Sequence, residues 1–103
     1  MLPVMTADSP TIVATSGGLV PGRRTRWVVA PLMEYALELS GVSARTPRIC
    51  FVATATGDHP AVLDALYEAA AARGLLASHL AAFPMPNVDD VAGHLLAQDM
   101  VSR

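Results

Sequence analysis

The sequence feature that most constrains the fold is an apolar run over residues 49–53, Ile-Cys-Phe-Val-Ala. A run of this length with β-branched and aromatic members is typical of a strand covered on both faces, as in the middle of a parallel sheet. A polar loop over residues 54–59 follows, and Pro60 then begins a helical pattern. Because ligands of open α/β sheets bind at the carboxyl ends of the strands, we expect any site to include this loop.

The same alternation of buried strand and amphipathic helix extends along the chain. Pro31 is tolerated only in the first turn of a helix, so the first helix is expected to begin between Trp27 and Pro31. Asp58 is the predicted N-cap of the second helix, and Gly74 is its predicted end. The predicted strands cover residues 11–15, 49–53 and 75–83, with a fourth beginning at Asp99; the predicted helices cover residues 27–39, 60–73 and a segment capped by Asn87, and residues 19–26 are a predicted loop.

This order predicts an α/β fold: a three-layer α/β/α doubly wound parallel sheet of flavodoxin-like type with right-handed crossovers. Residues 1–10 carry two prolines and no periodicity, which indicates a loose lead-in. Residues 11–103 form the predicted domain. We expect this domain to be partial and truncated at the fourth strand, because only two apolar residues follow Asp99 and strands usually have about 5 to 6 residues.

Composition narrows the function classes. The 103 residues are 52% hydrophobic and 16% charged, with a mean hydropathy of +0.41, which excludes a disordered chain and suggests surface that meets a partner, a homo-oligomer included. The formal charge of −2 gives no overall reason to expect nucleic acid or an anionic membrane as a partner. No apolar run approaches the roughly 18 residues of a membrane span, and no secretory signal pattern occurs, so we expect a cytoplasmic protein.

Residue types exclude further chemistry. All seven basic residues are arginine, so the chain lacks the lysine of a Walker phosphate loop or of a Schiff base. The single Cys50 lies in the apolar run, where a buried thiol acting as a small hydrophobe is expected. His59, His79 and His94 have no metal-ligand spacing, and we predict no metal and no cofactor. His59 alone lies in the expected ligand loop.

Residues 17–24 have the outer glycine spacing of a phosphate-binding loop between a strand and a helix. Arg23 and Arg24 stand where the loop's lysine and Ser/Thr would be, and Pro21 removes one backbone N–H. A nucleotide-binding α/β domain is therefore an alternative, set against a plain turn. Arg23, Arg24 and Arg26 also form a small basic patch, which we expect to be solvated because aromatic residues are not interleaved with it.

Residues 14–18, Ala-Thr-Ser-Gly-Gly, are one substitution from the Gly-x-Ser-x-Gly nucleophile elbow. Asp58 and either His79 or His94 would complete the order Ser, Asp, His after Ser16. A long loop follows Ser16 in place of a helix, and the two histidines fall in a predicted strand and a predicted helix. The alternative is that Ser16 satisfies backbone groups of its own turn.

Taken in succession, these pieces resemble the amino-terminal half of the peptidase E family. The segments that carry the resemblance are residues 12–18, 48–57, 72–75, 86–90 and 99–101. The family consists of cytoplasmic serine exopeptidases, including aspartyl dipeptidases, whose fold is similar to that of class I glutamine amidotransferases. The resemblance implies a small peptide as substrate, once the missing carboxyl-terminal half of the domain completes the site.

In that family the fourth strand continues into a Gly-Gly-Gly segment, and a Gly-x-Ser-Ala-Gly elbow, a histidine and an acidic residue follow. This chain departs from the pattern at Ser102 and Arg103, so no catalytic residue is carried over, and we expect no hydrolysis by the chain alone. A binding or assembly module that uses an open sheet edge is the second hypothesis. The residues expected at the rim of the substrate site are Ser16, Gly17, Gly18, Thr54, Thr56, Asp58 and His59.

Overall fold

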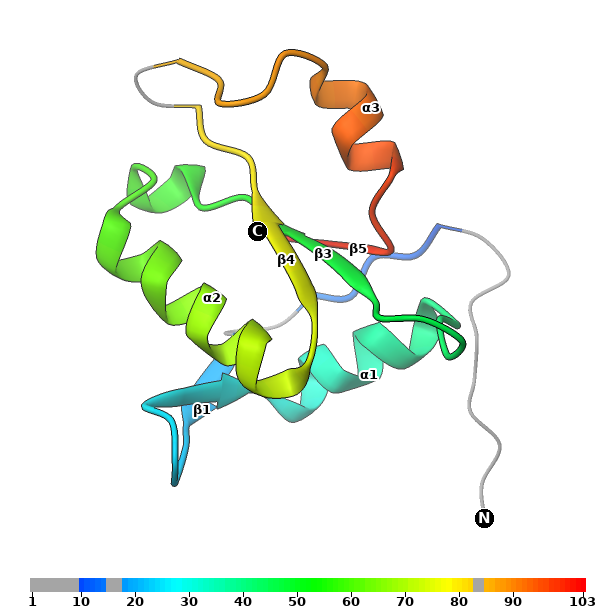
Figure 1. Cartoon of the computed structure of the whole chain (residues 1–103), viewed down its shortest axis with the longest axis vertical. Coiled ribbons are helices and arrows are strands. Elements are labelled where there is room, and N and C mark those ends of the chain that lie inside the picture. Colours follow the sequence, from blue (N-terminus) through cyan, green and yellow to red (C-terminus); the bar gives the residue numbers. More distant parts are fainter. Residues whose placement is uncertain (1–9, 15–17, 83–84) are drawn as a thin grey trace.

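The structure is a computed structural model that describes residues 10–14, 18–82 and 85–103. The helices and strands follow one another along the chain as shown in Figure 1. In order they are β1 (Leu19–Pro21), β2 (Trp27–Val29), α1 (Pro31–Leu39), β3 (Arg48–Phe51), the 3-10 turn η1 (Thr54–Thr56), α2 (Pro60–Arg73), β4 (Leu76–His79), α3 (Val91–Leu96) and β5 (Met100–Ser102).

A parallel sheet of three strands in the order β4-β3-β5 forms the centre of the molecule. Ile49 in β3 lies opposite Ala77 in β4 and Met100 in β5, and both Ile49 and Cys50 are fully buried. An α/β fold with a buried, parallel central strand is therefore confirmed. Among the described helices, none has the length and apolar character that crossing a bilayer requires.

Helices lie on both faces of this sheet. Ile49 and Phe51 point to one face, where they pack with Met33 and Leu37 of α1 and Ala70 of α2. The intervening strand positions point to the other face, where the Ser78 hydroxyl of β4 lies 3.0 Å from Nε2 of His94 in α3. The chain passes from β3 through α2 to β4 on one side of β3, and then from β4 through α3 to β5 on the other side. Because right-handed crossovers connect parallel strands, two helices whose connections run in opposite senses lie on opposite faces of the sheet (Figure 1).

A two-stranded antiparallel hairpin replaces the predicted loop and the predicted start of the first helix. Leu19–Pro21 pair with Trp27–Val29, so the prediction of a loop over residues 19–26 was wrong for β1. Trp27–Val29 are aromatic and β-branched residues, which suit a strand. The first helix begins at Pro31, the later of the two expected positions, with the proline in its first turn.

Residues 11–14 form no strand, which corrects the prediction of a first strand over residues 11–15; Thr15 lies outside the described residues. Residues of this segment and of β5 together line two cavities of about 370 and 500 Å³. A few residues further on, the Gly18 carbonyl accepts a hydrogen bond from the Ala30 N–H at 2.9 Å. The Gly18 carbonyl therefore forms its hydrogen bond next to the hairpin and not within the parallel sheet.

The third strand is shorter than predicted, because β4 ends at His79 rather than at position 83, which lies outside the described residues. Beyond it the side chain of Asn87 holds the backbone. Its Oδ1 accepts from the Ala81 N–H at 2.8 Å, and its Nδ2 donates to the His79 carbonyl at 3.0 Å. Asn87 is therefore not a helix cap, and α3 is capped instead by Asp90, which accepts from the Gly93 N–H at 2.9 Å.

Candidate functional site

The loop after β3 lies at the carboxyl edge of the sheet, where the sequence predicts the site. Its two threonines are exposed. The Thr56 hydroxyl donates to the Ala53 carbonyl at 2.8 Å, and the Gly57 N–H donates to the Thr54 carbonyl at 2.9 Å. Gly57 has φ +68°, a left-handed conformation that glycine adopts without strain. The loop is thus a closed turn that leaves the Thr54 side chain at the surface.

The helix-cap role that the sequence suggests for Asp58 belongs to His59. His59 is the N-cap of α2, since its Nδ1 accepts from the Ala61 N–H at 3.1 Å, so the prediction of Asp58 as the cap was wrong. Asp58 has φ +54° and its Oδ2 accepts from the Ala82 N–H at 2.8 Å. Asp58 therefore connects the loop after β3 to the segment after β4.

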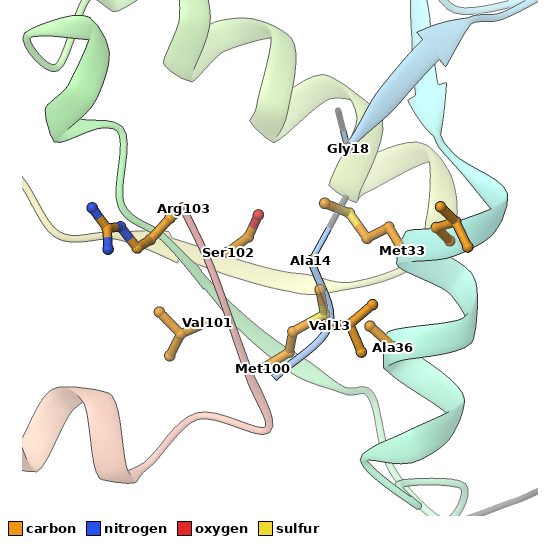
Figure 2. Close-up of a pocket in the computed structure, with 10 residues that line it drawn as sticks. Val13, Ala14, Gly18, Met33, Ala36, Met100, Val101, Ser102 and Arg103 are labelled. Carbon is orange, nitrogen blue, oxygen red and sulfur yellow. The ribbon is translucent and has the colours of Figure 1, made fainter. Parts of the chain in front are cut away.

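Gly18 lies at a different part of the same sheet edge, beside β5. It lines the cavity of about 370 Å³ together with Met33 and Ser102 (Figure 2). A Cβ atom built on Gly18 would lie 2.5 Å from the Met33 methyl, so a larger residue here would require the Met33 side chain to move. The residues of the loop 54–59 do not line this cavity. The structure thus places the predicted rim residues in two separate groups, and Ser16 and Gly17 lie outside the described residues.

The cavity beside β5 is lined by residues 13–14, by α1 and by β5. Figure 2 shows the Met100 side chain pointing toward Val13, whereas Val101 and Arg103 point away from it across the strand. Val101 is 45% exposed, although it belongs to the parallel sheet. Among the described residues, β5 pairs with β3 alone, and the cavity lies on its other side.

The Ser, Asp, His order considered from the sequence is not assembled among the described residues. His79 lies on the α2 side of the sheet, where its Nδ1 is 2.7 Å from the Tyr67 hydroxyl. His94 lies on the α3 side beside Ser78. Asp58 bonds the backbone of Ala82. The two histidines are separated by the sheet, and each has a neighbouring hydroxyl of its own.

The sequence does not predict the contact between Ser78 and His94. Ser78 lies within β4, and His94 lies four residues beyond the Asp90 cap of α3. Nothing in the spacing of these residues along the chain points to a contact, because it depends on how α3 crosses the sheet. Both side chains are half-buried, in the middle of a strand and a helix rather than at the carboxyl edge.

Cys50 is a buried thiol, as the sequence predicts. Burial raises the pKa of Cys50, which disfavours the thiolate form that nucleophilic chemistry requires. Burial likewise raises the pKa of Tyr67, whose ring packs edge to face against Phe51 at a centroid distance of 6.2 Å. These groups form the interior of the sheet rather than a reactive centre.

The strongest charge cluster lies at the opposite edge of the sheet, where the strands begin. Asp99 accepts from both terminal nitrogens of Arg45 at 2.7 Å and from the Arg48 N–H at 2.7 Å. The hydrogen bonds from Arg45 lower the pKa of Asp99. This cluster holds the start of β5 against the start of β3. Within the described residues, no group of three or more His, Cys, Asp or Glu side chains could hold a metal ion.

Comparisons with protein-family models, with curated proteins and with solved structures found no match to this chain. The class of protein that the structure defines is thus an α/β domain with a three-stranded parallel sheet. What the predicted rim offers chemically is the exposed Thr54 hydroxyl, the imidazole of His59 and the backbone groups around Gly57. These groups can bind a polar ligand by hydrogen bonds.

Proposed function

We propose that this chain is the amino-terminal part of a peptidase E-like serine exopeptidase, with a sheet of the class I glutamine amidotransferase type. The observation that supports the proposal best is the buried parallel strand β3 and the polar loop after it, which begins with Thr54 and ends at the cap His59. In this proposal the loop contributes to the rim of a dipeptide site in the cytoplasm. In this proposal the chain itself contributes no catalytic nucleophile.

We infer further that the chain does not hydrolyse peptides alone. Acyl transfer requires a nucleophile beside a base, with hydrogen-bond donors aimed at the developing oxyanion. Among the described residues, Ser78 and His94 are a hydroxyl and an imidazole at 3.0 Å, but they lie within β4 and α3 rather than at the carboxyl edge. No step of hydrolysis is therefore assigned to them.

Incubation with aspartyl dipeptides, followed by measurement of the released amino acids, tests this proposal. We expect no release above the buffer control. Amide NMR shifts on titration with the same dipeptides should be confined to residues 54–59 and Gly18, and His59→Ala should reduce them. Turnover that Ser16→Ala or Ser78→Ala abolishes would contradict the absence of a nucleophile, and shifts located elsewhere would contradict the position of the rim.

No described residue pairs with β5 on the side away from β3, which favours a second candidate function, that of an assembly module. β5 pairs with β3 on one side, and residues 11–14 on its other side make no strand pairing with it. Val101 is 45% exposed there and Ile12 is 95% exposed. Unpaired strand edges and exposed apolar side chains promote pairing with another chain.

Sedimentation velocity at several protein concentrations tests this second candidate. We expect the sedimentation coefficient to rise with concentration, and we expect Val101→Lys to weaken the association because a lysine on an edge strand opposes pairing. Leu96→Lys is the matched control, since Leu96 is 86% exposed but belongs to α3 and not to the edge strand. A monomer at every concentration would exclude the assembly module.

A further inference from the structure

The hairpin formed by β1 and β2 carries a concentration of positive charge at its tip. The connection between the strands, residues 22–26, reads Gly-Arg-Arg-Thr-Arg. Residues 18–30 contain no acidic residue, although the whole chain has a net charge of −2. Figure 1 shows the hairpin projecting from the body of the molecule, beyond α1 and α2. Its tip is therefore a local basic site on an acidic protein.

The guanidinium groups at this tip are available to a partner. Arg45 and Arg73, elsewhere in the chain, are engaged in ion pairs with Asp99 and Glu34. By contrast, the side chains of the three tip arginines are exposed and form no ion pair with any residue that the structure describes; they are Arg23, Arg24 and Arg26. The nearby Glu68 accepts a hydrogen bond from the backbone N–H of Arg26, not from its guanidinium.

Hydrogen bonds also stabilise the conformation of the tip. The Gly22 N–H donates to the Arg26 carbonyl at 3.2 Å, and the Thr25 hydroxyl donates to the Trp27 carbonyl at 2.9 Å. The bond from the Arg26 N–H to Glu68 at 3.0 Å fixes the hairpin to α2. A Cβ atom on Gly22 would meet the Thr25 carbonyl at 2.5 Å, so the turn is tight. A partner that binds here does not have to order the backbone first.

We propose that this arginine hairpin binds the phosphate backbone of duplex nucleic acid. Guanidinium groups bind phosphate through paired hydrogen bonds, and all the basic residues of this chain are arginine. Because β2 packs against α2, the proposed contacts are made by the tip to the phosphate backbone and not by the strands within a groove. Residues 22–26 include no apolar side chain to enter a lipid interface, and the 37% exposed Val20 belongs to the adjoining strand, so we commit to the duplex and make an anionic membrane the competing outcome of the test.

One phosphate contact from each of the three arginines predicts how strongly the affinity depends on the salt concentration. The logarithm of the association constant should fall against the logarithm of the salt concentration with a slope of roughly −2.7 for three contacts. Affinity should then decrease about 40-fold between ~50 and ~200 mM salt. Because no base contact is invoked, duplexes of different sequence should bind alike. The inference is independent of the proposed peptidase relationship.

Fluorescence anisotropy of a labelled mixed-sequence DNA duplex of about 20 base pairs, titrated at several salt concentrations, tests the proposal. The triple variant Arg23→Gln, Arg24→Gln, Arg26→Gln should bind at least about tenfold more weakly at low salt, and its slope should approach zero. The single variant Arg24→Gln should reduce the slope by about one. Arg103→Gln, an equal change of charge on β5's side of the molecule, should leave both quantities unchanged.

Circular dichroism of each variant shows whether the fold is retained, and the single variant keeps the test decisive if the triple variant unfolds. Three results would overturn the proposal: no binding by the native chain at low salt, equal binding by the native chain and Arg24→Gln with equal slopes, or equal losses in Arg103→Gln and Arg24→Gln. Binding to phosphatidylserine vesicles without binding to the duplex would also overturn it, in favour of a membrane partner.

Discussion

At the scale of single residues, Asp99 is the side chain on which most polar contacts converge. Its two oxygens accept from Arg45 and from the Arg48 backbone, and its own N–H donates to the Arg48 carbonyl at 2.9 Å. The exposed fraction of its side chain is 11%, against 51% for Arg45. Asp99 therefore connects β5 to β3 where both strands begin, and it also lines the cavity of about 500 Å³.

The lowered pKa of Asp99 predicts how stability depends on pH. Its charged form is favoured in the folded state, so its contribution is complete above the unfolded pKa of about 4 and is lost as pH falls through the lower folded pKa. Asp99→Asn should lower the Tm at neutral pH by a few degrees, and this difference should shrink below pH ~4. Thermal unfolding across this pH range measures it.

Asp89→Asn is the matched control, because Asp89 is exposed and forms no hydrogen bond or ion pair with any other residue that the structure describes. Asp89→Asn should leave the Tm nearly unchanged at both ends of the pH range. A constant difference between the native chain and Asp99→Asn at every pH would contradict the argument.

At the scale of elements, α2 ends because Gly74 adopts a conformation that other residues resist. Gly74 has φ +80°, and its N–H donates to the carbonyls of Ala70 and Ala71. A Cβ atom there would meet nothing within 4 Å, so a substitution changes the backbone strain but causes no collision. A substitution at Gly74 therefore measures the cost of the left-handed backbone conformation without a change in side-chain packing.

Gly74→Ala should therefore lower the free energy of unfolding by about 1–2 kcal/mol, because a left-handed conformation is unfavourable for alanine. Gly74→Asn should lower it less, since asparagine tolerates this conformation better. Urea unfolding of the two variants measures the difference. An alanine variant as stable as the native chain would show that the helix end can rearrange.

At the scale of the whole molecule, one cluster of apolar side chains joins the sheet to α1 and α2. Ile49 lies at its centre, fully buried, with Met33, Leu37 and Ala70 around it. Domains of this size have a total stability of about 5–15 kcal/mol, so the loss of one central side chain is a large fraction of it. The exposed Ile12 contributes nothing comparable.

Ile49→Ala should destabilise the protein by about 2–4 kcal/mol, because apolar contacts are lost and a cavity remains. Ile12→Ala, the same substitution at a position 95% exposed, should change the stability by less than about 0.5 kcal/mol. Urea unfolding monitored by circular dichroism measures both. Equal effects of the two substitutions would show that β3 is not the centre of the core.

Local patterns were enough to predict β3, α2 and the position of the polar loop after β3. An unbroken apolar run, a proline in the first turn and a glycine after Arg73 each act over a few neighbouring residues. Ser16 and Gly17 of the predicted rim lie outside the described residues. Gly18 lies apart from the loop 54–59, beside β5.

What the sequence by itself determined is therefore the buried parallel strand, the helix after it and the α/β class, because each depends on residues close together in the chain. Only the tertiary structure decided that Trp27–Val29 pair with Leu19–Pro21, that residues 11–14 stay out of the sheet, and that His94 meets Ser78. The physical reason is that a strand or a hydroxyl can satisfy its hydrogen bonds with several distant partners, and the packing of the whole chain selects among them.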